Sequence, residues 1–316
     1  MKTEDNELDV PMEKPYLLHF ATPGTRVSPF DVNMAYDAGW NAVIPYAGVD
    51  LDAIGDFTQD AIFSRGPKGA KRTGIFIGGR DAMLAHDMLE RARQAMVPPF
   101  EVSVFADPSG AYTTAAAMIA KVERALSSQH GLTLAGRRLT IFGGTGPVGM
   151  VAAILAAEAG AEVTLPGHDG LARAQVIADQ IETRFGLKVR AVDGAGESAK
   201  LALLADTEIA LATAKAGVRV LGATHLAQAP MLRVAADINA VPPAGIDGIG
   251  VMDDASPLAA ASGHAVGIGP LAIGNVKYQV QRALLQAMLS AEKPLYLGFA
   301  ERSEERRVGK ECRSRW

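Results

Sequence analysis

The residues best suited to chemistry form a glycine-rich loop near the middle of the chain. The loop reads G-x-G-x-x-G and consists of Gly144, Thr145, Gly146, Pro147, Val148 and Gly149. A strand is expected before it (residues 138–142) and a helix after it (residues 147–160), which is the context in which this pattern binds a dinucleotide. Gly144 would permit a tight turn, and Gly146 would let the backbone approach a pyrophosphate. Gly149 would let the helix pack closely on the sheet. We therefore expect dinucleotide phosphates at the helix N–H groups; the alternative is a glycine-rich turn without a ligand.

The segment after the next strand, expected over residues 162–165, bears on the identity of the dinucleotide. His168 and Asp169 follow this strand, and Arg173 lies a few residues further on. An acidic side chain here binds the ribose hydroxyls of NAD, whereas a basic one accepts the 2′-phosphate of NADP. Because both types are present, NAD and NADP both remain candidates, and His168 fits a surface loop equally well. The candidate cofactor-binding set is completed by Thr213, Asp237 and Asn239.

Two polar clusters lie in the first part of the chain. Ser28 and Asp31 stand at the start of an expected helix, where an N-cap and a first-turn acid would explain both. A larger set follows the strand expected over residues 102–105 and contains Asp107, Tyr112, Thr113 and Thr114. A helix cap accounts for one of these four residues but not for all of them. They follow the carboxyl end of a strand, where the sites of α/β proteins gather.

A third cluster joins a glycine-rich segment to Asn275 and Lys277. We expect a loop up to residue 274 and a helix over residues 275–291. Lys277 then lies in the first turn, where a cation opposes the helix dipole by about 0.3 kcal/mol or more. This unfavourable position beside a glycine-rich loop favours a functional lysine over an ordinary solvated one.

The remaining composition excludes several other classes of protein. The six histidines lack the spacing of metal ligands, so no metal site is expected. No G-x-S-x-G motif occurs and the one cysteine is Cys312, so no covalent nucleophile is expected. A formal net charge of −4 provides no general attraction to nucleic acid. We expect no signal peptide, and we find no apolar run of about 20 residues, the length that spans a bilayer. A cytoplasmic protein without a membrane partner is therefore expected.

The elements that must position these residues alternate between strands and helices, which favours an α/β fold with parallel sheets. In the first part, strands are expected over residues 16–20, 42–46, 73–77 and 102–105. In the second part, strands are expected over residues 138–142, 162–165, 188–192, 209–212 and 233–236, in the β-α-β order of a doubly wound domain. Two long helices, expected over residues 113–128 and 275–291, would bridge the two parts.

The length of 316 residues suggests two domains. We expect an N-terminal α/β substrate domain over residues 15–130 and a Rossmann-type doubly wound dinucleotide-binding domain over residues 131–274. A helix over residues 275–300 would return to the first domain. Residues 301–316 hold ten charged side chains and no apolar periodicity, so a disordered tail, or a segment foreign to the enzyme, is expected there.

Six segments carry the motifs of one known family: residues 28–39, 73–79, 97–100, 105–110, 237–246 and 274–278. They resemble the NAD(P)-dependent methylene-tetrahydromethanopterin dehydrogenases of methylotrophic bacteria. The resemblance runs from Tyr16 to Phe299, nearly the whole chain. The phosphate loop looks more like the branch of that family that uses only NADP, whereas residues 167–170 resemble the branch that uses both coenzymes.

The resemblance implies an oxidoreductase of one-carbon metabolism that acts in formaldehyde oxidation. Such an enzyme moves a hydride from the methylene group of a reduced pterin to NAD or NADP. The two flanking nitrogens stabilise the methenyl cation, so the step requires no general base, and catalysis consists mainly of juxtaposing the two molecules. The resemblance places the pterin between the domains and Lys277 at the active site. We add Asp107 as a second catalytic candidate, and as substrate-binding candidates Ser28, Asp31, Tyr112, Thr113, Thr114 and Asn275.

Two alternatives remain open at this point. A methylene-tetrahydrofolate dehydrogenase would use the same chemistry on a related pterin. A non-catalytic dinucleotide-binding sensor would have no need for Asp107, Thr113, Thr114 and Lys277 to face one cleft. Hydride-transfer enzymes of this architecture are usually homo-oligomers, so a homo-oligomer is expected, with a small-molecule pterin as the other partner.

Overall fold

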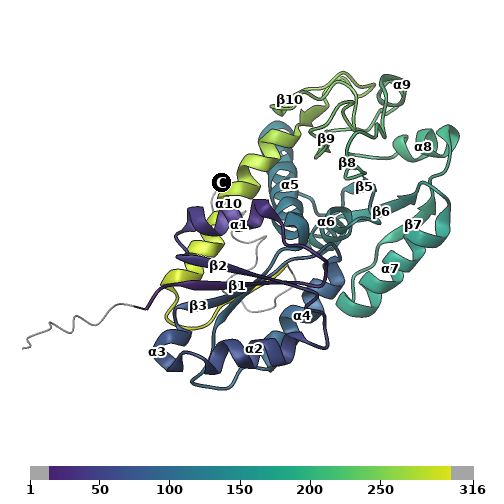
Figure 1. Cartoon of the computed structure of the whole chain (residues 1–316). Helices are drawn as coiled ribbons and strands as arrows, with labels where there is room; N and C mark the ends of the chain where they lie inside the picture. Colours follow the sequence, from purple (N-terminus) through teal and green to yellow (C-terminus); the bar gives the residue numbers. More distant parts are fainter. Residues whose placement is uncertain (1–13, 300–316) are drawn as a thin grey trace, which may run out of the picture.

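Two β-sheets organise the chain, and each has its own set of helices (Figure 1). The structure is a computed structural model that describes residues 14–299. The tail expected over residues 301–316, and Cys312 with it, lies outside the described residues. Within residues 14–299, no helix is long and apolar enough to cross a membrane.

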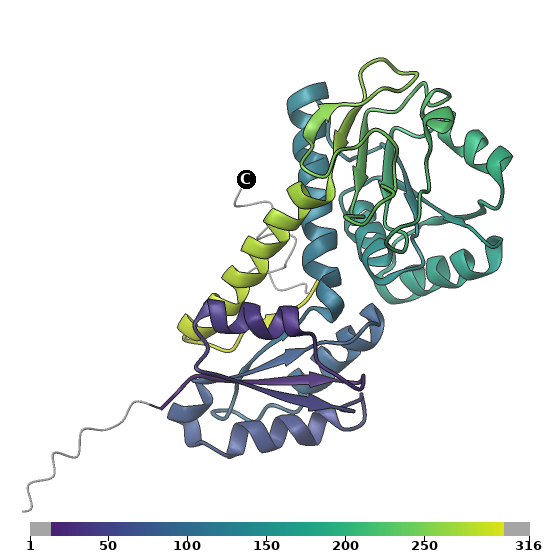
Figure 2. The ribbon, with the colours of Figure 1, turned by 45° about the horizontal axis from the view of Figure 1, so that its top comes forward.

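The first sheet is parallel throughout and has the order β12-β4-β3-β1-β2. Its strands are β1 (Leu17–Thr22), β2 (Ala42–Ala47), β3 (Thr73–Ile77), β4 (Ser103–Ala106) and β12 (Tyr296–Leu297). The helices between them are α1 (Pro29–Ala38), α2 (Ile54–Phe63), α3 (Gly66–Ala70) and α4 (Ala82–Gln94). Helices α2 and α3 lie on the opposite face of this sheet from α1 (Figures 1 and 2). All residues of β3 and β4 are buried, as is usual for inner parallel strands.

The second sheet has the order β10-β11-β9-β8-β5-β6-β7, with β10 antiparallel to β11 and the other pairs parallel. Its strands are β5 (Arg138–Phe142), β6 (Glu162–Gly167), β7 (Arg190–Asp193), β8 (Ile209–Ala212), β9 (Val234–Asp237), β10 (Asp254–Pro257) and β11 (Val266–Ile268). Its helices are α6 (Pro147–Glu158), α7 (Leu171–Phe185), α8 (Glu197–Leu204) and α9 (Ala223–Leu226). Counted from β5, the parallel strands have the Rossmann order 3-2-1-4-5-6. The order reverses between β5 and β8, and a ligand of such a sheet binds at the carboxyl ends of the strands there.

Two long helices connect the sheets. Helix α5 (Ala111–Ala125) continues into a π-helical turn at Leu126–His130, and α10 (Pro270–Ser290) packs along α5 (Figure 2). Lys121 Nζ of α5 lies 2.8 Å from Asp254 Oδ2 of β10, which ties the helix to the second sheet. After α10 the chain returns to the first sheet, where β12 pairs with β4. The expected two-part α/β fold with long bridging helices is therefore confirmed.

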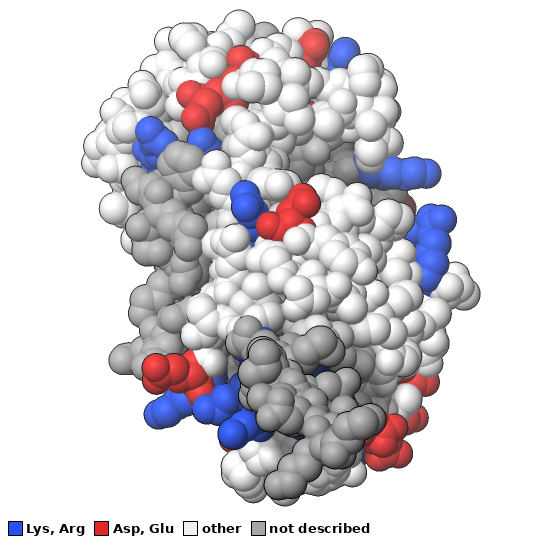
Figure 3. All heavy atoms as spheres, turned by 60° about the vertical axis from the view of Figure 1, so that its left-hand side comes forward, with Lys and Arg blue, Asp and Glu red and all other residues white. Residues whose placement is uncertain are grey.

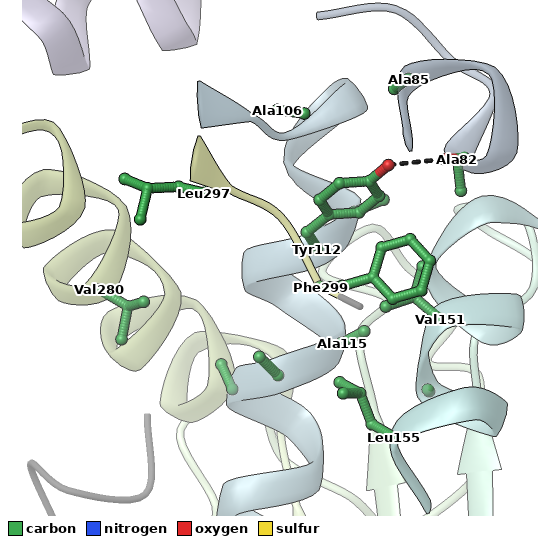
Figure 4. Packing of buried hydrophobic residues seen from close by; sticks show 14 of the residues in the cluster. Ala82, Ala85, Ala106, Tyr112, Ala115, Val151, Leu155, Val280, Leu297 and Phe299 are labelled. Atoms are coloured by element: carbon green, nitrogen blue, oxygen red, sulfur yellow. Dashed lines mark hydrogen bonds between the residues drawn. The ribbon is translucent and has the colours of Figure 1, made fainter. Parts of the chain in front are cut away.

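The hydrophobic core runs without interruption between the two parts of the molecule. Tyr112 of α5 packs edge-on against Phe299, with ring centroids 4.7 Å apart. Figure 4 shows these rings beside Val151 and Leu155 of α6. The Tyr112 hydroxyl donates a hydrogen bond of 2.6 Å to the carbonyl of Ala82, so the buried ring leaves no unpaired polar atom (Figure 4). This packing holds the start of α5 in a defined position.

Helix α10 begins earlier than the sequence predicts. Gly269 is its N-cap and Pro270 its first residue, a position that suits the fixed φ of proline. Residues 270–274, which were expected to form a loop, are therefore helical. Lys277 lies seven residues beyond Pro270 and outside the first turn, so the prediction that it opposes the helix dipole is wrong.

Candidate active site

A cleft of about 1330 Å³ lies at the carboxyl edge of the first sheet. The loops after β1 and β3, the start of α1, and the turn after β4 form its walls. Among the expected site residues, Ser28, Asp31 and Lys277 line it. The carboxyl ends of parallel strands meet at one edge, which explains why residues so distant in sequence share one cleft.

Lys277 projects from α10 into this cleft and is partly buried. Its Nζ donates a hydrogen bond of 2.6 Å to Gln281 Oε1 and lies 3.6 Å from the centre of the Phe30 ring. A cation over a ring face is stabilised by the ring quadrupole. Burial lowers the pKa of Lys277, and the carboxylates of Asp107 and Asp31 act in the opposite direction. The cleft thus holds a desolvated ammonium with two carboxylates nearby.

Asp31 lies in the first turn of α1 and is 4% exposed. Its backbone N–H donates to Ser28 Oγ at 3.4 Å, so Ser28 is the N-cap that the sequence indicates. Its carboxylate Oδ1 accepts a hydrogen bond of 2.6 Å from Gln281 Nε2. Burial raises the pKa of Asp31, while the hydrogen bond from Gln281 and the charge of Lys277 oppose that rise. A helix-capping role therefore explains Ser28 but not the buried carboxylate.

Asp107 directly follows β4 and is fully buried. Its Oδ1 accepts from the backbone N–H groups of Tyr112 (2.9 Å) and Thr113 (3.2 Å), and its Oδ2 accepts from Thr113 Oγ1 (2.6 Å). Burial raises the pKa of Asp107 to about 6, although the charge of Lys277 acts to lower it. This carboxylate holds the start of α5 and contributes charge behind Lys277. No part of Asp107 is exposed, so in this structure it acts on the cleft through its charge and through α5.

The other substrate-binding candidates occupy different environments. Tyr112 and Thr113 are fully buried, and their hydroxyls donate hydrogen bonds within the protein. Thr114 is half-buried and donates to the Gly110 carbonyl at 2.6 Å. Asn275 is exposed on α10 and is not among the residues that line the cleft.

The glycine-rich loop connects β5 to α6 as predicted, and Gly146 is the N-cap of α6, with Pro147 as its first residue. The positive φ of the turn belongs to Gly143, at +90°, so the tight-turn role expected of Gly144 falls to its neighbour. A Cβ on Gly149 would lie 2.6 Å from both the Gly143 carbonyl oxygen and Thr213 Oγ1. Thr213 follows β8 and donates to the Phe142 carbonyl at 3.2 Å. The loop, α6 and β8 therefore pack without space for a side chain at position 149.

Asp237, the last residue of β9, and Asn239 form hydrogen bonds with the loop that follows this strand. Asp237 is fully buried and accepts from the backbone N–H groups of Asn239 (2.8 Å), Gly245 (2.7 Å) and Ile246 (3.1 Å). Asn239 accepts from two backbone N–H groups and donates to the carbonyl of Pro243 at 2.8 Å. Both side chains stabilise the loop through these hydrogen bonds.

The residues that bear on the choice of coenzyme are exposed at the end of β6. The side chain of His168 is 77% exposed and that of Asp169 is 45% exposed. Arg173 Nη1 lies 3.4 Å from Asp169 Oδ2. Asp169, which could bind ribose hydroxyls, thus lies beside Arg173, which could bind a 2′-phosphate. Both side chains are exposed, and among the described residues neither forms a hydrogen bond with a buried one.

Sequence reasoning missed two residues at the site. Gln281 is fully buried, and it links Lys277 to Asp31. Phe30 places its ring under the ammonium of Lys277. The available signal was spacing, since residues four apart on a helix share a face, which pairs Gln281 with Lys277. Within residues 14–299, no group of three His, Cys, Asp or Glu side chains could hold a metal ion.

Comparison with known proteins connects this geometry to a family. The model described as Methylene-tetrahydromethanopterin dehydrogenase, N-terminal, matches residues 29–109, which include Asp31 and part of the cleft wall. A protein of Methylorubrum extorquens named NAD(P)-dependent methylenetetrahydromethanopterin dehydrogenase is 52% identical over 285 residues, 90% of this chain and 95% of its own length. The chain belongs to the methylenetetrahydromethanopterin dehydrogenase family.

A more distant relative and a solved structure extend the comparison. The Bifunctional protein MdtA of Methylorubrum extorquens is 32% identical and covers 90% of this chain and 96% of its own length. The NAD-dependent malic enzyme of Thermotoga maritima has a similar fold, with a TM-score of 0.57, 13% identity, and coverage of 95% of this chain and 83% of its own. At that identity the likeness concerns the fold alone. The family assignment for this dehydrogenase therefore rests on the sequence relatives.

Proposed function

We propose that this chain is an oxidoreductase that transfers a hydride from methylene-tetrahydromethanopterin to NAD⁺ or NADP⁺. The observation that carries the proposal is the 52% identity, over 90% of the chain, to a protein named for this activity. The cleft and the phosphate loop supply a place for each reactant. The products are methenyl-tetrahydromethanopterin and the reduced nicotinamide.

Two buried carboxylates near Lys277 suit this reaction. When the methylene C–H bond breaks, its electron pair leaves with the hydride for the nicotinamide ring, and a positive charge develops over the N–C–N group of the pterin. Lys277 carries one positive charge and the nearby carboxylates of Asp31 and Asp107 carry two negative charges when both are ionised. Arg26, Arg80 and Asp81 also line the cleft, so its charges do not sum to a negative value. We propose that the two buried carboxylates favour the developing cation locally, because fixed charges in a desolvated site act strongly on it. Lys277 itself is proposed to orient the pterin by a hydrogen bond.

The dinucleotide is proposed to bind at the carboxyl edge of the second sheet. Gly144, Thr145, Gly146, Pro147, Val148 and Gly149 place the start of α6 where its N–H groups meet a pyrophosphate. Asp169 and Arg173 stand where the ribose is expected, and together they accommodate either coenzyme. The nicotinamide would then extend toward the cleft that holds Lys277.

The test crosses two pterins with two coenzymes. Purified protein is mixed with methylene-tetrahydromethanopterin or methylene-tetrahydrofolate, each with NAD⁺ or NADP⁺, and reduction of the nicotinamide is followed by absorbance. The proposal expects turnover with methylene-tetrahydromethanopterin and both coenzymes. Turnover with methylene-tetrahydrofolate alone would assign the chain to the alternative dehydrogenase, and binding of dinucleotide without any turnover would make it a sensor.

Domain limits, assembly and location belong to the same proposal. We propose a pterin domain over residues 15–130, a dinucleotide domain over residues 131–274 and a returning helix over residues 275–300, which the pairing of β12 with β4 supports. A homo-oligomer in the cytoplasm is proposed as well. Large exposed apolar side chains occur on α1 and α10, namely Phe30, Tyr36, Leu271 and Tyr278. Charged side chains are sparse over much of the face shown in Figure 3, and gel filtration with light scattering tests the assembly.

A further inference from the structure

Gln281 is a buried polar side chain placed between two charged ones. It lies on α10, one helical turn after Lys277, and is 0% exposed. Lys277 Nζ donates to its Oε1 at 2.6 Å, and its Nε2 donates to Asp31 Oδ1 at 2.6 Å. One neutral amide therefore bridges the cation of the cleft and a carboxylate that comes from another helix 250 residues away.

The charges on either side determine which way the amide points. Its oxygen can only accept, so it must face the ammonium, and its NH₂ group can only donate, so it must face the carboxylate. Hydrogen bonds with one charged partner are roughly twice as strong as bonds between neutral groups. The amide does not titrate, and the charged groups that face the bridge are Lys277, Asp31 and, behind the lysine, Asp107.

The bridge also determines where the ammonium can act. An ammonium has three N–H donors. One is occupied by Gln281 and a second direction is taken by the ring of Phe30, 3.6 Å away. The remaining donor is left for the cleft that Lys277 lines. Without the amide, Lys277 and Asp31 would be free to pair directly, and the ammonium would be drawn toward α1.

We propose that Gln281 is a positioning residue for hydride transfer, which holds the Lys277 ammonium toward the pterin by separating it from Asp31. The proposal rests on the proposed function, because the pterin is the molecule that Lys277 would orient. Gln281 acts through Lys277 and Asp31 and does not itself contact substrate. It should therefore affect kcat and the protonation of Lys277 while leaving the dinucleotide site unchanged.

Three variants test this role. Gln281→Met keeps the length of the side chain and removes both hydrogen bonds. Gln281→Glu keeps the acceptor for Lys277. The control, Gln279→Met, makes the same chemical change at an exposed position of α10. We expect Gln281→Met to lower kcat about 100-fold, as misplacement by about 1 Å can do, with the dissociation constant of the dinucleotide unchanged. Gln279→Met should match the wild type. Gln281→Glu should recover activity as pH falls, because a proton shared between the introduced carboxylate and that of Asp31 restores the donor that the amide supplied.

A second measurement separates this inference from the proposed function. Acetylation of Lys277 by acetic anhydride, quantified by mass spectrometry of its peptide across pH, reports the lysine pKa without any pterin. Direct pairing of the ammonium with Asp31 should raise that pKa in Gln281→Met, and an added carboxylate should raise it in Gln281→Glu. Identical labelling curves in wild type and both variants would overturn the inference even if the enzyme is active. Shifted curves in a protein without turnover would support the bridge and contradict the proposed function instead.

Discussion

Gly110 and Lys277 are in contact across the cleft. A Cβ built on Gly110 would lie 2.9 Å from Lys277 Cε and 3.1 Å from its Nζ. Gly110 has a φ of +67° and forms the N-cap of α5, at the turn that leaves β4. The end of the lysine thus occupies the volume that a side chain at position 110 would fill. The position of the ammonium depends on this turn as well as on Gln281.

Gly110→Ala should reduce turnover through this contact. The added methyl pushes the ammonium out of place, and we expect kcat to fall about tenfold or more. The positive φ also destabilises the fold by about 1 kcal/mol. Gly131→Ala is the matched control, because Gly131 has a φ of +65° and nothing lies within 4 Å of its added methyl. Urea unfolding should show equal losses of stability in the two variants, whereas steady-state kinetics should show a loss of kcat in Gly110→Ala only. Equal kcat values in the two variants would contradict a role for this contact in turnover.

Asp107→Asn should change how stability depends on pH. The pKa of Asp107 is raised to about 6 in the folded chain, from 3.8 in the unfolded chain, so the folded state binds the proton more tightly. Between these two values the stability contributed by this group falls as pH rises, by about 3 kcal/mol in total. Urea unfolding of wild type and Asp107→Asn at about pH 4 and about pH 7 measures the difference. The wild type should lose stability relative to the variant as pH rises, and a difference that stays constant would refute this assignment.

Gly149→Ala should damage the dinucleotide site. Its methyl would lie 2.6 Å from the Gly143 carbonyl oxygen and from Thr213 Oγ1, so α6 must move away from the sheet. We expect weaker dinucleotide binding by about tenfold and a loss of about 1–3 kcal/mol in unfolding free energy. Gly274→Ala is a control within another helix, where nothing lies within 4 Å of the methyl. It should stabilise the chain by up to about 1 kcal/mol, and calorimetric titration with each coenzyme should leave its affinity unchanged.

Asp169 and Arg173 should determine the balance between the coenzymes. Arg173→Ala removes a cation for the 2′-phosphate and should lower kcat/KM for NADP⁺ about tenfold relative to NAD⁺, while Asp169→Asn should shift the ratio toward NADP⁺. Initial rates with each coenzyme at saturating pterin measure the ratio. If neither variant changes it, the end of β6 does not contact the ribose.

Long buried strands and their adjoining helices were predictable from the sequence. The strands over Thr73–Ile77, Arg138–Phe142 and Ile209–Ala212 and the helix over Leu171–Phe185 have the predicted limits. The sequence of each of these elements has a distinct apolar or amphipathic pattern, and such a pattern indicates which residues are buried. Helix α2 and the two-residue strand β12 were not predicted. β12 exists because it pairs with β4, almost 200 residues earlier, and local sequence carries no signal for such a partner.

The candidate site was predictable only in part. A polar cluster at a helix start identified Asp31, a polar cluster after a strand identified Asp107, and the family resemblance identified Lys277. Sequence could not show that Asp107 is sealed inside the protein, because that depends on how α5 and β4 pack. Helical spacing pairs Gln281 with Lys277, but the role of Gln281 appears only once Asp31 is brought within 2.6 Å of its amide.

The central claim is that a hydride moves directly from the methylene carbon to the nicotinamide. The most direct measurement uses methylene-tetrahydromethanopterin with two deuterium atoms on the methylene carbon and analyses the reduced coenzyme by mass spectrometry. We predict that the reduced nicotinamide carries one deuterium in ordinary water. A reduced nicotinamide that carries only solvent hydrogen, or no reduction with either coenzyme, would contradict the account.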